Sequence, residues 1–282
     1  MNQEDSVQSV LNDKQPKETL AQQRFGQHAQ AYVTSAPHAQ GEDLDRLLAL
    51  AQPQADWRVL DVATGGGHTA LKFAPYVAHV TASDITPAML NAAERHLTDK
   101  GVTNVAFKQV AAEDMPFDDA SFDLVTCRIA PHHFDDAARF VREAARVLKP
   151  CGTLLVQDHL VPDDAMTARY YEAFEKLRDP SHNQAFTEAE WRAMFAAADL
   201  AVTHVERLYK DLNVDSWAER QGVTPNTKAC LSALIELAPS AVLNWMQPQQ
   251  WGTSEATYRC HHIIIAGALL PCRDPAMLQS EW

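Results

Sequence analysis

Short apolar segments alternate with helical patterns through the middle of the chain. Five of these segments are rich in Val, Leu or Thr and have the length of strands: residues 58–62, 77–82, 102–110, 122–129 and 153–157. Between them, apolar side chains recur at helical spacing, most clearly in residues 140–148. Alternation of this kind predicts right-handed crossovers and a doubly wound, mostly parallel α/β sheet.

The segments before this core have a different pattern. Residues 20–52 are helical by composition and predict a cover ahead of the first strand, whereas residues 1–19 are polar and predict a flexible tail. The core itself, residues 53–160, is the predicted ligand-binding part of the fold.

The chain after residue 160 is predicted to complete the same domain up to residue 270, with residues 271–282 as a tail. Two further strand patterns, 202–208 and 258–266, flank a largely helical insertion at 211–255. Such a pair can add an antiparallel edge to a parallel sheet, which predicts a seven-stranded sheet in all.

Composition narrows the class of partner. The 282 residues have a formal net charge of −13, which would repel a phosphate backbone, so no nucleic-acid partner is expected. The longest strongly apolar stretch, 263–270, is far shorter than the ~20 residues of a bilayer helix, so no membrane span is expected. Five cysteines without a Cys-x-x-Cys pair predict buried, reduced side chains in a cytoplasmic protein.

A glycine turn follows the first predicted strand. Asp61 ends that strand, and Gly65 to Gly67 let the backbone turn sharply and approach a ligand closely. The second strand leads to Asp84, whose carboxylate can accept both hydroxyls of a ribose. Because ligands of open α/β sheets bind at the carboxyl ends of strands, these residues predict a nucleoside ligand.

Two kinds of nucleoside ligand compete for this turn. Gly65, Gly67 and Ala70 satisfy the Gly-x-Gly-x-x-Gly/Ala pattern of a dinucleotide site. A carboxylate at Asp61, however, would repel a pyrophosphate, whereas it would stabilise an ammonium or sulfonium group. The charge pattern therefore favours S-adenosyl-L-methionine over a nicotinamide dinucleotide.

Ordered segments of the chain resemble a known family, the class I S-adenosylmethionine-dependent methyltransferases. The resemblance rests on residues 59–67 (VLDVATGGG), 83–86 (SDIT), 112–117 (AEDMPF), 122–125 (FDLV) and 147–150 (VLKP). Within the family, the chain is most similar to the small-molecule subgroup that includes the ubiquinone and menaquinone C-methyltransferases. Residues 127–134 and 178–182 resemble a bacterial branch of that subgroup.

The resemblance implies a cofactor site in which Asp61 acts on the methionine ammonium, Asp84 binds the ribose and Ile85 packs on the adenine. The expected cofactor-binding residues are Asp61, Ala63, Thr64, Gly65, Gly67, Asp84, Ile85, Met89, Ala112, Glu113 and Arg128. Arg128 has a second interpretation, because it could instead pair with one of the many acidic side chains.

His132 and His133 are the catalytic candidates, since they follow the fourth strand at the edge where the methyl group should lie. A histidine there could act as a general base. Methyl transfer can also proceed by positioning alone, in which case one histidine would cap the next helix and the other would pack. Cys260-His261-His262 lacks a second ligand pair at zinc-site spacing, so no metal is predicted.

Residues 25–32 resemble the helix that closes over the cofactor in related methyltransferases, which makes Tyr32 and His28 candidates for the acceptor site. Arg178 and His182 are candidates for the same site by resemblance. The aromatic residues of the insertion predict either another wall of this site or a homodimer contact.

The sequence thus predicts an enzyme that transfers a methyl group to a small organic acceptor, at carbon, oxygen or nitrogen, by in-line displacement. Two alternatives remain open: a nicotinamide-dependent dehydrogenase, and a protein that binds S-adenosylmethionine without turnover.

Overall fold

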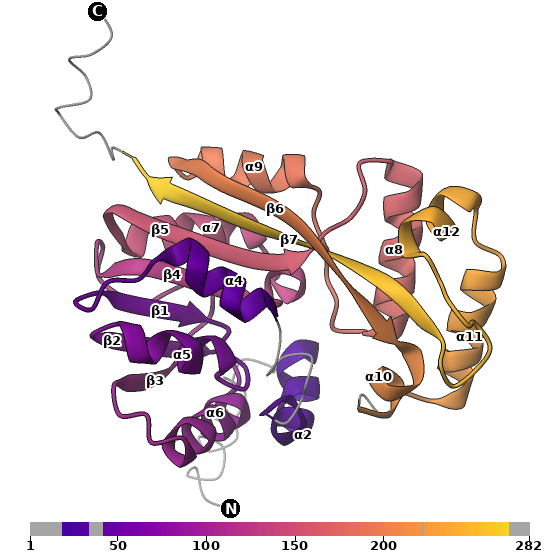
Figure 1. The fold of residues 1–282 in the computed structure, drawn as a ribbon, viewed down its shortest axis with the longest axis horizontal. Coiled ribbons are helices and arrows are strands. Elements are labelled where there is room, and N and C mark those ends of the chain that lie inside the picture. Colours follow the sequence, from indigo (N-terminus) through magenta and orange to yellow (C-terminus); the bar gives the residue numbers. More distant parts are fainter. Residues whose placement is uncertain (1–18, 34–41, 221–222, 271–282) are drawn as a thin grey trace, which may run out of the picture.

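A seven-stranded mixed sheet forms the centre of the molecule, as expected (Figure 1). The computed structural model describes residues 19–33, 42–220 and 223–270. The strand order is β3-β2-β1-β4-β5-β7-β6, with β7 antiparallel to both neighbours. The strands are β1 Arg58–Val62, β2 His79–Asp84, β3 Val105–Gln109, β4 Phe122–Arg128, β5 Leu148–His159, β6 Leu200–Asn213 and β7 Thr257–Leu269. The order reverses between β1 and β4, and such a switch point is where open α/β sheets bind ligands.

The last strands are longer than the sequence patterns predict. Strand β6 was expected to end at residue 208 and the helical insertion to begin at 211, but β6 continues to Asn213, which pairs with Thr257 of β7. Strand β5 likewise extends over 148–159 rather than 153–157. The reason is the pairing partner. Strand β6 carries charged residues that break the apolar pattern, yet its backbone pairs with β7 from Leu200 to Asn213, with one irregularity between Val202 and His204.

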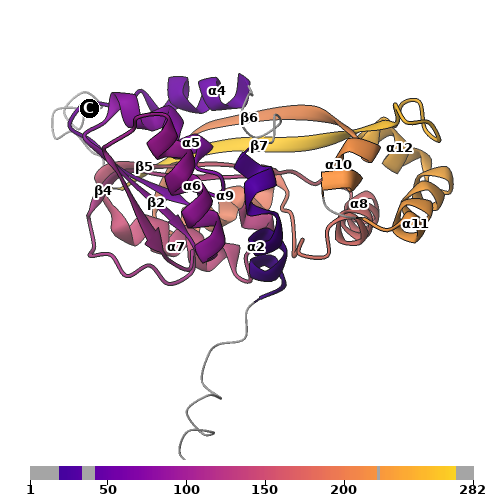
Figure 2. The same cartoon turned by 90° about the horizontal axis from the view of Figure 1, so that it is seen from below.

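Helices cover both faces of the sheet (Figures 1 and 2). Alternate residues of a strand face opposite ways, so Val59 and Leu124 pack with α4, α5 and α6, whereas Leu60 and Val125 pack with α7 and α9. The helices are α2 Leu20–Val33, α4 Glu42–Ala51, α5 His68–Phe73, α6 Pro87–Asp99, α7 Ala137–Val147, α8 Ala165–Arg178, α9 Glu188–Ala197, α10 Val214–Arg220, α11 Pro225–Glu236 and α12 Ser240–Met246, with 3-10 turns η2 Ala74–Tyr76 and η3 Pro131–His133.

A lobe lies beyond the main sheet, where the outer parts of β6 and β7 extend (Figure 1). Helices α8, α10, α11 and α12 pack there around their own apolar cluster, which includes Tyr171, Phe174, Met246 and Tyr258. We call this the outer lobe. It contains the helices of the predicted insertion, whose role on the substrate side or in a dimer stays a prediction.

No single helix in the described ranges is long and apolar enough to cross a bilayer. Helices α11 and α12 are together long and apolar enough, but the chain bends by 116° between them.

The cysteines only partly match expectation. Cys127 and Cys260 are buried and reduced, but Cys230 is exposed on α11. Cys151 is exposed and disulfide-bonded, so the expectation of a buried, reduced side chain is wrong there.

Candidate functional site

A cavity of about 320 Å³ lies at the carboxyl ends of the central strands. Its walls come from the loops after β1, β2, β3 and β4, from α2, and from the segment 180–183. Of the expected cofactor-binding residues, these line it: Ala63, Thr64, Gly65, Asp84, Ile85, Met89, Ala112, Glu113 and Arg128. Loops that are far apart in sequence meet here because parallel strands end at one edge of the sheet.

The glycine turn has two parts with different roles. Gly65 has φ of 54°, and a Cβ there would meet nothing within 4 Å, so the backbone is open to the cavity. Gly67 has φ of 81°, but a Cβ there would lie 2.7 Å from Cδ1 of Leu97 and 3.2 Å from Cβ of Ala93. Gly67 therefore brings the turn against α6. Ala63, just before the turn, also has a left-handed φ of 52°, a conformation that glycine adopts more readily than alanine.

Asp84 links the ends of β1 and β2. Its Oδ2 accepts a hydrogen bond from the Gly65 amide at 3.0 Å, and its Oδ1 accepts one from the Thr86 amide at 2.9 Å. Burial raises the pKa of Asp84 above its ordinary value, against the effect of these amides. Each carboxylate oxygen has a second lone pair, so Asp84 can still accept hydroxyl groups from a ligand in the cavity.

Asp61 lies behind the cavity wall and does not line it. Its carboxylate is 1% exposed and accepts hydrogen bonds from the hydroxyls of Thr64, at 2.6 Å, and Thr126, at 2.8 Å. Burial raises the pKa of Asp61 to about 6. Asp61 therefore reaches the cavity only through Thr64, which does line it.

One wall of the cavity is apolar and has acidic residues at one end. Ile85, Met89, Val110 and Ala112 line it, and the Glu113 carboxylate accepts a hydrogen bond from the Asp135 amide at 3.1 Å. Glu113 thus joins the loop after β3 to the loop before α7. An apolar slot beside polar groups suits a flat heteroaromatic ring.

Arg128 makes the ion pair that its second interpretation anticipated. Its Nη2 lies 2.7 Å from Oδ2 of Asp43 on α4, and Lys210 and Gln157 donate to the same oxygen, both at 2.9 Å. Burial alone would raise the pKa of Asp43, but the guanidinium and the ammonium hold it below its ordinary value. Arg128 still contributes atoms to the cavity wall.

The two histidines of η3 have different positions. His133 lines the cavity, its Nδ1 lies 2.9 Å from the Ser181 carbonyl oxygen, and the ring of Phe25 meets it edge-on. His132 is buried behind it and contacts Asp158. Neither caps the next helix, because Asp136 is the N-cap of α7 and accepts from the Arg139 amide.

The predicted acceptor residues are separated by the fold. His182 lines the cavity, but Arg178 does not: it is buried, and its Nε donates to Glu175 at 2.8 Å. Tyr32 and His28 belong to α2, but their side chains lie outside the described residues.

The cavity is also lined by residues that the sequence patterns did not predict, namely His68, Thr86, Phe134, Asp135 and Asn183. In the sequence, the only indication that these residues belong to the site is that each lies near one of the expected motifs.

Helix α2 lies over the cavity and packs on α6. Gln22 donates to the Ile85 carbonyl at 3.3 Å, and Arg24 lies 3.7 Å from Asp179. A helix in this place excludes water from one side of the site.

Comparison with known proteins agrees with this geometry. A family model described as a methyltransferase domain matches residues 60–156. The chain is 42% identical over 198 residues to YcgJ of Bacillus subtilis, an uncharacterized methyltransferase, and this match covers 70% of the chain and 78% of YcgJ. The chain belongs to the class I S-adenosylmethionine-dependent methyltransferases.

Other relatives of this methyltransferase support the same family. The ubiquinone/menaquinone biosynthesis C-methyltransferase UbiE of Ectopseudomonas mendocina is 33% identical over 167 residues, which cover 58% of the chain and 65% of UbiE. The crystal structure of Bacillus subtilis YcgJ has a TM-score of 0.78 at 35% identity, over 81% of this chain and 98% of that one. Family membership favours the methyl donor over the dinucleotide that Gly65, Gly67 and Ala70 would also allow.

The residues of the methyltransferase site fit S-adenosylmethionine. The open backbone at Gly65 leaves room for a ligand, Asp84 can accept ribose hydroxyls, and the wall from Ile85 to Val110 is apolar, as an adenine requires. No pyrophosphate-binding cation lines the described cavity apart from Arg128, which is paired with Asp43.

Proposed function

We propose that this methyltransferase transfers the methyl group of S-adenosylmethionine to a small organic acceptor. The observation that carries the proposal is the continuity of the cavity, which runs from Gly65 and Asp84 to His133 and His182 beneath α2. A covered cavity suits a small molecule better than a polymer. The net charge of −13 also disfavours a nucleic-acid acceptor.

The cofactor would lie along the strand ends. Asp84 would accept the ribose hydroxyls, and Ile85 with Met89 and Ala112 would flank the adenine. The backbone of Ala63 to Gly65 would face the methionine end. Asp61 would act through Thr64, whose hydroxyl donates to it, rather than touch the ammonium directly.

The acceptor would occupy the end of the cavity near His133. S-adenosylmethionine bound along the strand ends would supply an electrophilic methyl group, and the residues around His133 would hold the acceptor in line with it. Positioning of the two groups and exclusion of water by α2 account for rate enhancement without a strong base.

His133 is suited to hold the acceptor rather than to remove a proton from it unaided. Burial and the neighbouring His132 lower the pKa of His133 to about 3, so the ring is neutral at pH 7. With Nδ1 committed to the Ser181 carbonyl, its Nε2 can accept a hydrogen bond from a hydroxyl or amine of the acceptor. Because relatives are named for ubiquinone and menaquinone biosynthesis, quinone-related phenols are the first acceptors to test.

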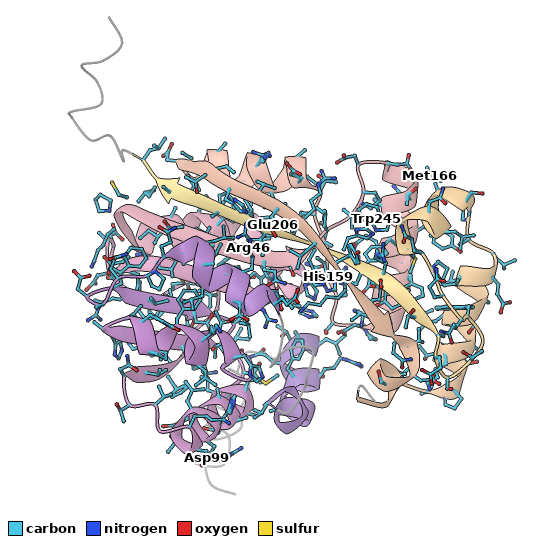
Figure 3. All side chains as sticks on the ribbon, in the orientation of Figure 1. Arg46, Asp99, His159, Met166, Glu206 and Trp245 are labelled. Atoms are coloured by element: carbon cyan, nitrogen blue, oxygen red, sulfur yellow. The ribbon has the colours of Figure 1, made fainter. Side chains whose placement is uncertain are left out.

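Calorimetry with S-adenosylmethionine, S-adenosylhomocysteine and NAD⁺ tests the cofactor site. We expect both adenosyl compounds to bind and Asp84→Ala to weaken them about 100-fold, since two hydrogen bonds to a charged group contribute ~3 kcal/mol. Asp84→Asn keeps the shape if the alanine variant is unstable. Asp99→Ala, at the exposed end of α6, is the control (Figure 3). Binding of NAD⁺ alone would overturn the proposal.

Turnover is tested with methyl-labelled cofactor and panels of phenols, amines and activated-carbon acceptors. We expect label in a product that depends on the acceptor, and a higher KM in His133→Ala. Tight cofactor binding with no product from any class would favour the alternative of a binding protein without turnover.

A further inference from the structure

A cluster of buried histidines lies between the main sheet and the outer lobe. His132 follows β4, His159 ends β5, and His182 follows α8, so three separate parts of the chain meet here. All three side chains are 4% exposed, and one nitrogen from each lies within 4.8 Å of the others. The ring of His132 stacks on that of His159, with centroids 4.2 Å apart. Figure 3 labels His159 at this junction.

The hydrogen bonds of the cluster leave imidazole lone pairs unused. Within the described ranges, Nδ1 of His182 and Nδ1 of His159 are buried and have no hydrogen-bond partner. Among the described residues, the Nε2 of His159 is near only the Cys260 sulfur, 3.8 Å away. A buried polar atom without a partner is destabilising, so two in one cluster indicate that another group binds them.

Carboxylates orient two of the three rings. Nδ1 of His132 lies 2.6 Å from Oδ1 of Asp158, and Nε2 of His182 lies 3.1 Å from Oε1 of Glu172. A carboxylate accepts, so these nitrogens donate, and the opposite nitrogen of each ring keeps its lone pair. Metal-binding histidines are commonly held in this way, with one nitrogen donating to a carboxylate and the other on the metal.

The cluster also includes a buried carboxyl group, that of Asp158. Asp158 is completely buried, and its Oδ2 has no partner among the described residues. A carboxylate in such a place is costly unless a cation lies nearby. A dication held by the three histidines would bind the opposite nitrogen of the His132 ring from Asp158, and the carboxylate would balance part of its charge through that ring.

We propose that His132, His159 and His182 bind one divalent transition metal, with zinc as the expected ion. Three neutral imidazoles suit zinc, and they leave a fourth position for water or another small ligand. Nitrogens bound to a tetrahedral zinc lie ~3.4 Å apart, and each ring must point a nitrogen lone pair at the ion. The stacked rings of His132 and His159 therefore have to tilt as well as approach one another on binding. Because His182 also lines the cavity, the metal lies beside the acceptor end of the site. The proposal does not rest on the proposed function.

A second group of potential ligands shares one residue with this site. His159, Cys260 and His262 also have ligand atoms within 4.8 Å of one another. Among the described residues, no carboxylate is hydrogen-bonded to the buried Nδ1 of His262, and the Cys260 sulfur already lies 3.4 Å from the Tyr171 hydroxyl. The geometry therefore favours the three-histidine site, and variants can separate the two.

The test uses the full-length protein without a histidine tag. We expect element analysis to find about one zinc per chain, and the chelator-stripped protein to take up Co²⁺ with the intense visible absorption of a four-coordinate site. His132→Asn and His182→Asn should each abolish that absorption. His204→Asn, in which a partly exposed histidine pairs with Glu206, is the matched control and should keep it.

Glu172→Gln provides a variant that removes no ligand. Glu172 orients His182 and also accepts a hydrogen bond from the Ala185 amide, which the glutamine oxygen can still accept. The variant should therefore weaken Co²⁺ binding 10–100-fold without abolishing it. The proposal is overturned if the wild-type protein binds no more Co²⁺ than His132→Asn does. It is equally overturned if His262→Asn loses the metal while His182→Asn keeps it. Calorimetry of the stripped protein with S-adenosylhomocysteine reports the cofactor site separately, so either hypothesis can fail alone.

Discussion

Gly67 and Gly101 both have positive φ angles, but only Gly67 is closely packed. Gly67→Ala would place a Cβ 2.7 Å from Leu97, whereas at Gly101 nothing lies within 4 Å. We expect Gly67→Ala to lower the free energy of unfolding by ~2–4 kcal/mol, from overpacking and backbone strain together. Gly101→Ala should cost only the strain, ~1–2 kcal/mol. Urea denaturation measures the free energy of unfolding of both variants. An equal decrease in the two would show that the contact of Gly67 with α6 is unimportant.

Asp61 should make stability depend on pH. Burial raises its folded pKa to about 6 from an ordinary 3.8, so the folded protein holds the proton more tightly than the unfolded chain. The contribution of Asp61 to the free energy of unfolding is therefore greatest below its pKa in the unfolded chain. This contribution is lost, by ~3 kcal/mol in all, as pH rises through its pKa in the folded protein. Asp61→Asn should flatten this part of the profile between pH 4 and 7, relative to Asp99→Asn. An unchanged slope in Asp61→Asn would show that Asp61 is not the titrating group.

At the scale of elements, one buried carboxylate fastens α4 to the sheet. Asp43 contacts Arg128 of β4, Gln157 of β5 and Lys210 of β6, so replacing it leaves two cations without this partner. We expect Asp43→Asn to lower the free energy of unfolding by ~3–5 kcal/mol. Asp45, on the same helix, pairs with Lys72 but is largely exposed, so Asp45→Asn should cost under ~1 kcal/mol. Thermal and urea unfolding compare the two variants, and similar losses would contradict a structural role for the Asp43 network.

At the scale of the molecule, the outer lobe and the main sheet have separate apolar clusters. Met246, fully buried in the lobe, should lose ~2–5 kcal/mol of local stability on replacement by alanine. We expect hydrogen exchange in Met246→Ala to accelerate in α8, α11 and α12 while β1 and β4 stay protected. Leu124→Ala, in the sheet, should instead accelerate exchange in β1 and β4. Uniform acceleration in Met246→Ala would mean that the two parts unfold as one unit.

The part of the site that could be predicted is the part built by local pattern. Asp84 ends β2, Ile85 follows it, and Gly65 lies in the turn after β1, so the positions of these residues follow once the strands are parallel. Asp61 was harder to interpret, because only the fold shows that the hydroxyls of Thr64 and Thr126 enclose its carboxylate. Arg178 was assigned to the acceptor site with His182, but its ion pair with Glu175 turns it away from the cavity.

The doubly wound sheet, the family and the nucleoside end of the cavity can be predicted from the sequence, because they depend on apolar periodicity and on residues next to one another in the chain. The length of β6, the pairing of Arg128 with Asp43, and the meeting of His132, His159 and His182 are seen only in the folded chain. Those three histidines are dispersed over 51 positions (182 − 132 + 1) and match no ligand spacing. Their proximity arises from the order of the strands and the packing of the outer lobe, which no local pattern records.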